Sequence, residues 1–249
     1  MCTLSLFKSD QSLIVTMNRD ESRARHEAGI KAREVSNINL LFPVDGLAGG
    51  TWFGINDSGV VMALLNRYQA QHVNNPTTRG KIIPRCLSMG SYSNIFEHLK
   101  HQSFAAFNPF DLFLMCLDRC HQFSWDGQHI TIKQIDESAF QFSSSGLDTA
   151  AILEKRQRGF NQILNNQQKT IWQSSEILEA IHLNQDPIDQ SSSVLMDRPL
   201  VHSKSICQVQ LTANKSEFNY YPEASLKAWR KDNISINELP KQERKFAIN

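Results

Sequence analysis

Short runs of apolar and β-branched residues, separated by polar turn residues, recur along the first half of the chain. Residues 4–7 and 13–17 flank a polar break, which predicts a hairpin. A second hairpin is expected where residues 51–56 and 60–66 flank an Asp-Ser-Gly turn. Residues 123–135 predict a third hairpin around Asp-Gly.

Longer periodic stretches predict helices, and further apolar runs predict strands. Helical patterns cover residues 82–100 with a break at Gly90, 148–164 and 174–183, and strand patterns cover 110–117, 201–211 and 218–221. The charged residues 22–27 have no apolar period and are interpreted as a loop. Since no βαβ alternation occurs, we expect antiparallel sheets with segregated helices, an α+β fold. We expect one domain over residues 1–225, followed by a polar tail, 226–249, packed on it or extending from it.

Composition narrows the classes of partner. The chain has 249 residues, of which 41% are hydrophobic, and a net charge of +1. The length and apolar content suffice for a buried core. The balanced charge argues against nucleic acid and anionic membrane surfaces. No apolar stretch is long enough for a membrane span, and the first residues do not resemble a signal peptide. Five cysteines without framework spacing indicate free thiols and a cytoplasmic location.

Cys2 directly follows the initiator methionine. Because residue 2 is small, removal of Met1 is favoured and would leave Cys2 as the first residue. Its α-amino group, with an ordinary pKa of roughly 7.7–8.0, would then serve as general base for its own thiol. The alternative is an inert thiol near a chain terminus.

Polar residues at the ends of the predicted hairpins supply candidate partners for this thiol. Pairing of residues 3–7 with 13–17 would bring residue 18 or 19 near Cys2, in the sequence Asn18-Arg19-Asp20-Glu21. A guanidinium and a carboxylate there would lower the thiol pKa and anchor the amine. Asn66, at the end of the second hairpin, is a candidate oxyanion donor. A solvated turn and a turn-capping asparagine are the alternatives.

Three motifs in this order resemble the NRDE family, also described as transport-and-Golgi-organisation-2-like. They are Met1-Cys2-Thr3, Asn18-Arg19-Asp20-Glu21 and Gly49-Gly50-Thr51-Trp52-Phe53-Gly54-Ile55. Later matches are Thr78-Arg79-Gly80 and Asn108-Pro109-Phe110-Asp111-Leu112. The family is similar in turn to N-terminal-nucleophile hydrolases of the choloylglycine hydrolase and penicillin V acylase type.

This resemblance implies an αββα sandwich of two antiparallel sheets with helices outside. It also implies that Arg19 and Asp20 support Cys2, with Asn18 or Glu21 as alternatives, and that Asn66 is an oxyanion donor. Two departures are visible. Ser144 stands where the acylases have a second oxyanion asparagine, and His202 or Lys204 stands where they have an arginine.

Two functions follow as hypotheses. The first is a hydrolase of a linear, non-peptide amide bond with Cys2 as nucleophile. The second is a non-catalytic binding or trafficking protein for a hydrophobic acyl or haem-like ligand, lined by Trp52, Phe53 and Phe142, since family members are linked to lipid homeostasis and haem trafficking. Both imply a small-molecule partner and leave the oligomeric state open.

Other candidate sites are weaker. Cys116, Cys120 and His121 lack the spacing of a metal or haem site, so we expect neither metal nor cofactor. The scattered histidines, His182 among them, are interpreted as surface residues. A modest basic patch is either a solvated loop or a site for an acidic ligand group; it contains Arg23, Arg25, His26, Lys31 and Arg33.

Overall fold

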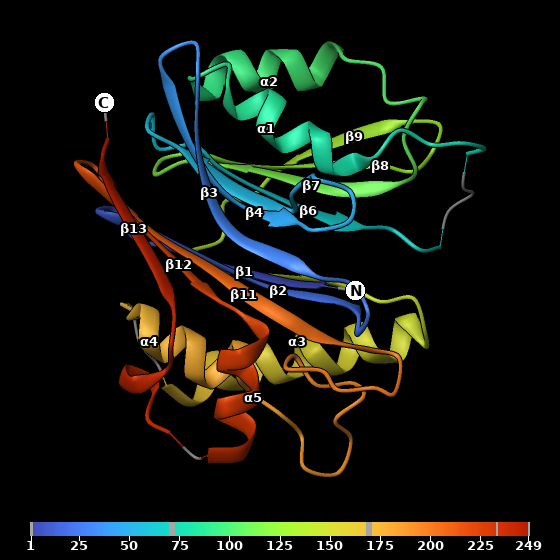
Figure 1. The fold of residues 1–249 in the computed structure, drawn as a ribbon, viewed down its shortest axis with the longest axis vertical. Helices are drawn as coiled ribbons and strands as arrows, with labels where there is room; N and C mark the ends of the chain where they lie inside the picture. The colour runs from blue at the N-terminus through green and yellow to red at the C-terminus, as the bar shows by residue number, and fades with distance from the viewer. Residues whose placement is uncertain (1, 70–72, 168–170, 233, 249) are drawn as a thin grey trace.

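The strands form two antiparallel sheets that lie face to face (Figure 1). The computed structural model describes residues 2–69, 73–167, 171–232 and 234–248. Sheet A has the order β10-β1-β2-β11-β12-β13, with β1 (Cys2–Lys8), β2 (Ser12–Ser22), β10 (Ala139–Ser144), β11 (Val201–Thr212), β12 (Lys215–Tyr221) and β13 (Gln242–Ala247). Sheet B runs in sequence order, with β3 (Glu27–Val35), β4 (Ile38–Asp45), β5 (Phe53–Asn56), β6 (Val61–Asn66), β7 (Phe110–Met115), β8 (Cys120–Trp125) and β9 (Ile130–Gln134).

Helices cover the outer face of each sheet (Figure 1). Sheet B carries α1 (Ile82–Leu87) and α2 (Tyr92–His101), and sheet A carries α3 (Thr149–Gln167), α4 (Ser174–Ile177) and α5 (Glu223–Asp232). Short turns of helix complete the set: η1 (Arg79–Lys81), the π-helical η2 (Leu178–His182) and η3 (Ile236–Glu238). The four layers confirm the expected αββα sandwich of the α+β class.

The strands β1 and β2 of sheet A are buried on both faces because the other sheet covers one face and helices cover the other. On β1, Leu4 and Leu6 enter the core between the sheets together with Val15 of β2. The alternate residues Phe7 and Ile14 pack instead against the helical layer. This alternation decides which polar residue at the strand ends faces the other sheet and which faces the helices.

The three predicted hairpins are present as β1–β2, β5–β6 and β8–β9. Gly90, at φ 77°, separates α1 from α2 as expected. The interpretation of residues 22–27 as a loop was wrong at both ends, since β2 continues through Ser22 and β3 begins at Glu27. Pairing of Ser22 with Val201 of β11 keeps the end of β2 extended, and only residues 23–26 form the turn and loop between the two strands.

Four strands have no counterpart in the sequence interpretation, namely β3, β4, β10 and β13. The segment 226–249, expected as a polar tail, contains most of α5 and the edge strand β13. That strand pairs antiparallel with β12, from Tyr220 opposite Gln242 to Lys215 opposite Ala247. Charged side chains suit an exposed edge strand, so its polarity gave no strand signal.

Candidate active site

Cys2 is the first residue of β1, and the strand register fixes its neighbours. It lies opposite Arg19 of β2 on one side and opposite Ser144 of β10 on the other. Directly opposed residues of antiparallel strands point to the same face of a sheet. The three side chains therefore share the face that looks toward sheet B, in line with Leu4 and Leu6. The expected approach of residue 18 or 19 to Cys2 is confirmed, with Arg19 as the paired residue.

A small cavity of about 140 Å³ opens beside Cys2. Its walls come from both sheets and from the loops that join their strands, and they include Cys2, Arg19, Trp52, Asn66 and Arg79. An engineered protein cavity that holds one benzene molecule has a volume of about 150 Å³. The cavity is thus the size of a reacting group and its nearest substituents, not of a long-chain ligand.

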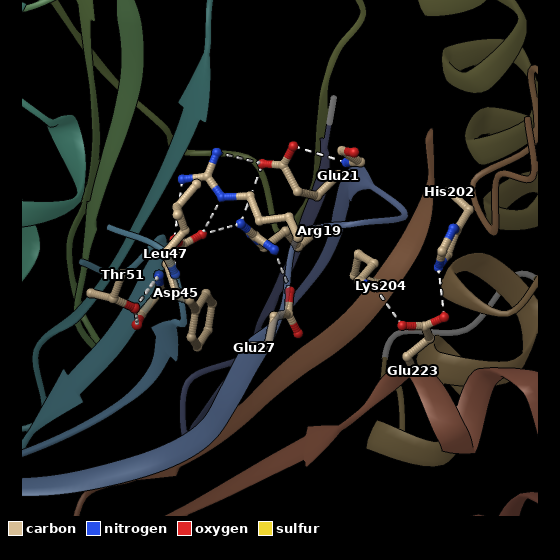
Figure 2. A network of polar contacts seen from close by, with 12 residues as sticks. Arg19, Glu21, Glu27, Asp45, Leu47, Thr51, His202, Lys204 and Glu223 are labelled. Atoms are coloured by element: carbon tan, nitrogen blue, oxygen red, sulfur yellow. Dashed lines mark hydrogen bonds and ion pairs between the residues drawn. The ribbon is translucent and has the colours of Figure 1, made fainter. Parts of the chain in front are cut away.

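Arg19 is the centre of a buried ion-pair network (Figure 2). Its Nη1 lies 2.5 Å from Glu27 Oε1, and its Nη2 lies 2.5 Å from Asp45 Oδ2 and 3.3 Å from Glu21 Oε2. The guanidinium carbon lies 4.2 Å from the centre of the Trp52 ring. With its side chain only 6% exposed, Arg19 is held by three carboxylates and an aromatic face.

A second arginine shares two of these carboxylates. Arg25 Nε lies 2.7 Å from Asp45 Oδ2, and its Nη1 lies 3.4 Å from Glu21 Oε2. The backbone amides of Leu47 and Ala48 also donate to Asp45 Oδ1. Burial raises the pKa of the Asp45 carboxyl, but these donors and the charge of the arginines outweigh it, so the pKa lies below its ordinary value.

Asp20 lies directly beside the thiol. Its backbone amide donates to Cys2 Sγ, and its carboxylate accepts a 2.6 Å hydrogen bond from Ser203 Oγ. Burial raises the pKa of the Cys2 thiol. The resting thiol is therefore protonated at neutral pH, and any reaction through its sulfur needs a base that takes this proton.

Asn66 approaches Cys2 from the other sheet. It ends β6, lines the cavity and makes a side-chain hydrogen bond with Tyr68. Burial raises the pKa of Tyr68, so its hydroxyl stays protonated at neutral pH. A Cβ atom built on Gly146 would contact the Tyr68 ring at 3.4 Å, so the ring bridges the ends of β6 and β10.

Asn18 points to the opposite face of sheet A, away from the cavity. Its Nδ2 donates to His182 O at 2.9 Å and to Val194 O at 3.2 Å, and its Oδ1 lies 2.5 Å from His182 Nδ1. His182 Nε2 lies 2.6 Å from Ser5 Oγ. The interpretation of His182 as a surface residue was wrong, because it is fully buried, and burial lowers its pKa to about 3.

Ser144 and His202 occupy different environments. Ser144 Oγ is buried next to Cys2 and has no hydrogen-bond partner among the described residues. His202 is 1% exposed, and its Nε2 is 3.1 Å from Oε1 of Glu223, the first residue of α5 (Figure 2). Lys204 contacts the same Glu223 and the carbonyl of Arg23. Neither His202 nor Lys204 lines the cavity.

Of the aromatic residues named as candidate ligand contacts, only Trp52 lines the cavity. The ring centres of Phe53 and Phe218 lie 5.6 Å apart in the core between the sheets. Phe142 lies 5.3 Å from Phe113 in the same core.

The Cys116 and Cys120 thiols are buried, and His121 Nδ1 lies 2.5 Å from the Tyr92 hydroxyl. Within residues 2–69, 73–167, 171–232 and 234–248, no cluster of His, Cys, Asp and Glu is arranged to hold a metal ion. No helix in the described part of the chain is long and apolar enough to cross a membrane.

Sequence reasoning gave no role to three residues that build the site. Asp45 and Tyr68 lie in segments where no predicted strand end or hairpin marked them as candidate site residues. Arg79 belongs to the Thr78-Arg79-Gly80 motif, but nothing in its spacing placed it near Cys2. Their positions depend on how sheet B and its loops meet sheet A.

Comparisons with known proteins agree with this architecture. A Caenorhabditis elegans N-acylethanolamine-hydrolyzing acid amidase ortholog is similar at a TM-score of 0.59 and 10% identity, over 84% of this chain and 92% of that chain. A C2A mutant of a conjugated bile acid hydrolase from Clostridium perfringens is similar at a TM-score of 0.54 and 9% identity, over 99% of this chain and 97% of that chain. Penicillin V acylase from Agrobacterium tumefaciens is similar at a TM-score of 0.52 and 11% identity, over 98% of this chain and 90% of that chain.

These likenesses establish a shared N-terminal-nucleophile hydrolase fold. No curated protein sequence matches the chain. The family model described as Transport and Golgi organisation 2 matches residues 1–225. The chain, with Cys2 at the start of β1 and the αββα sandwich around it, belongs to the Transport and Golgi organisation 2 family.

Proposed function

We propose that this protein is a cysteine hydrolase that cleaves a linear, non-peptide amide bond, with Cys2 as the nucleophile after removal of Met1. The main support is that Cys2 and Asn66, from different sheets, line one small polar cavity. A nucleophile and a side-chain amide across such a cavity suit attack on a carbonyl and stabilisation of its oxyanion.

The base in this proposal is the α-amino group of Cys2 itself. Because burial raises the thiol pKa, the thiol needs a base to take its proton. This base must lie next to the thiol and must be uncharged near pH 7–8, as an α-amino group is. Asp20, which Ser203 holds in place, supplies a carboxylate for the ammonium form. Arg19 fixes the strand end opposite Cys2 through its own ion pairs.

The reaction proceeds by transfer of the acyl group to sulfur. The amine takes the thiol proton, sulfur bonds to the carbonyl carbon, and the carbonyl oxygen becomes an oxyanion. Cleavage of the carbon–nitrogen bond releases the leaving amine, which takes the proton from the α-ammonium. Water then attacks the thioester while the α-amine removes its proton. Cleavage of the carbon–sulfur bond releases the carboxylic acid, and sulfur regains its proton.

Two donors are proposed for the oxyanion. Asn66 contributes its side-chain amide, which Tyr68 orients. Ser144 contributes its hydroxyl, which is buried beside Cys2 and otherwise lacks a partner among the described residues. A buried hydroxyl without a partner is costly, and a hydrogen bond formed only during the reaction would recover that cost.

The alternative is a binding or trafficking protein on the same fold. A cavity of about 140 Å³ is too small for a haem-like macrocycle, so the cavity favours the amide over that ligand. We further propose a cytoplasmic location, which the five free cysteines support.

The test combines intact mass with hydrolysis. The intact mass of protein purified from its native host is measured to establish whether Met1 is removed. Release of fatty acid is then measured over a panel of N-acyl amides. We expect Cys2→Ala to abolish release and Cys116→Ala, at a buried thiol that does not line the cavity, to retain it. Complete retention of Met1, or undiminished release by Cys2→Ala, would rule out this mechanism. Ligand binding without hydrolysis would favour the binding protein.

A further inference from the structure

Arg79 enters the same cavity as Cys2. Its side chain is half-buried, and Nη1 donates a 2.6 Å hydrogen bond to the carbonyl of Pro109. The guanidinium carries five N–H donors in a fixed plane, so this single contact leaves most of them for another acceptor.

The position of Arg79 is fixed by the backbone on both sides. The amide of Thr51 donates to Gly80 O at 3.0 Å, which ties the segment to the loop that precedes β5. The amide of Thr77 donates to Ala106 O at 2.8 Å. A side chain held between two such anchors is preorganised for binding.

The other charged side chains of the cavity are already compensated. Arg19 and Arg25 form ion pairs with Glu21 and Asp45. Asp20 accepts from Ser203 and serves the amine in the proposed function.

Arg79 differs from these two arginines. No carboxylate of the described residues lies within ion-pair distance of it, and the charges that act on it are those of Tyr68 and Cys2. Both of these groups are neutral at pH 7 because burial raises the pKa of each. An arginine that is partly withdrawn from water and unopposed by an anion favours an anionic ligand.

We propose that Arg79 binds a carboxylate carried by the amine portion of the amide substrate, so that the cavity selects N-acyl amino acids over neutral acyl amides. This inference rests on the proposed function. The small, polar cavity suits a short amine portion. The acyl chain would leave past two exposed residues next to the lining. Leu47, 80% exposed, precedes the lining residue Ala48, and Tyr68, 37% exposed, bonds to the lining residue Asn66.

The test measures binding apart from catalysis. Cys2→Ala protein is titrated calorimetrically with N-decanoylglycine and with N-decanoylglycinamide, which differ only in the carboxylate. We expect the anion to bind at least tenfold more tightly. Arg79→Gln should remove this preference by weakening only the anion, and Arg79→Lys should restore part of it. Arg67→Gln is the matched control, since Arg67 pairs with Asp111 and does not line the cavity.

The possible outcomes separate the two proposals. Equal affinities for the two ligands, equal weakening of both by Arg79→Gln, or no binding of either would overturn the role of Arg79. If Cys2→Ala protein prefers the anion but the unsubstituted protein hydrolyses neither compound, the hydrolase is refuted and the anion site is retained. If the unsubstituted protein hydrolyses both amides with equal kcat/KM, the hydrolase is retained and the selection of the anion by Arg79 is overturned.

Discussion

The backbones of Gly50 and Gly80 touch. A Cβ atom built on Gly50 would lie 2.7 Å from Gly80 Cα, and one built on Gly80 would lie 2.9 Å from Gly50 Cα. Neither glycine has a positive φ, so room for the contact, not backbone conformation, requires them. The contact joins the loop that carries Trp52 to the segment that carries Arg79, and it shapes the cavity beside Cys2.

Gly80→Ala should therefore disturb both stability and the site. The added methyl group meets backbone atoms that cannot rotate away, and overpacking of this kind costs about 1–3 kcal/mol. Urea denaturation would measure the loss, and titration with N-decanoylglycine would report displacement of Arg79. Gly159→Ala is the control, because Gly159 lies within α3 and has no atom within 4 Å of a built Cβ. It should gain roughly 0.5–1 kcal/mol from helix propensity; a loss like that of Gly80→Ala would contradict the steric argument.

Arg19→Met should destabilise the fold by about 3–5 kcal/mol, because it removes a cation from the buried Glu27 and one of two arginines from the buried Asp45. Arg23→Met, at an exposed pair with Asp197, should cost less than about 1 kcal/mol. Urea denaturation at pH 7 compares the two variants.

Lowering the pH should reduce the difference in free energy of unfolding between Arg19→Met and the unsubstituted protein. The pKa of Asp45 is lowered in the folded protein, so its contribution is present above the unfolded pKa, about 3.9, and is lost as pH falls through the folded value. Without Arg19 the pKa of Asp45 rises, so this carboxyl is protonated at a higher pH in the variant than in the unsubstituted protein. A deficit that stays constant as the pH falls from 7 to 3 would argue against unpaired charge as its cause.

His182 predicts a separate dependence of stability on pH. Its folded pKa of about 3 lies below the unfolded value of about 6.5, so the unfolded state binds more protons between these limits. This contribution is present above pH 6.5 and is lost as pH falls, at up to about 1.4 kcal/mol per pH unit. In His182→Gln, urea denaturation from pH 7 to 4 should give a flatter curve than the unsubstituted protein. Parallel curves would mean that His182 titrates normally.

Asn66→Ala tests the oxyanion donor. Loss of one such donor lowers kcat by about 10²–10³, and KM should change little because the bond forms mainly in the transition state. Release of decanoate from N-decanoylglycine measures both constants. Tyr68→Phe should give a smaller decrease in kcat with the same KM, since it removes only the hydrogen bond that orients Asn66. An unchanged kcat in Asn66→Ala would exclude this donor.

Local patterns predicted the hairpins because each depends on a turn and on alternation within about a dozen residues. They therefore also placed residue 18 or 19 near Cys2, since one hairpin sets that distance, and the observed register selects Arg19. The same patterns missed β3 and β13, whose charged residues are extended only because neighbouring strands supply hydrogen bonds.

By itself the sequence determined the family, the sandwich and the approach of residue 18 or 19 to Cys2. Only the tertiary structure decided the rest of the site. It turned Asn18 toward His182, because successive residues of a strand point to opposite faces and the location of the two cores fixes which face is which. It also brought Asn66 and Arg79 from sheet B and its loops to Cys2. Contacts between sheets arise from packing of whole layers, which no local spacing encodes.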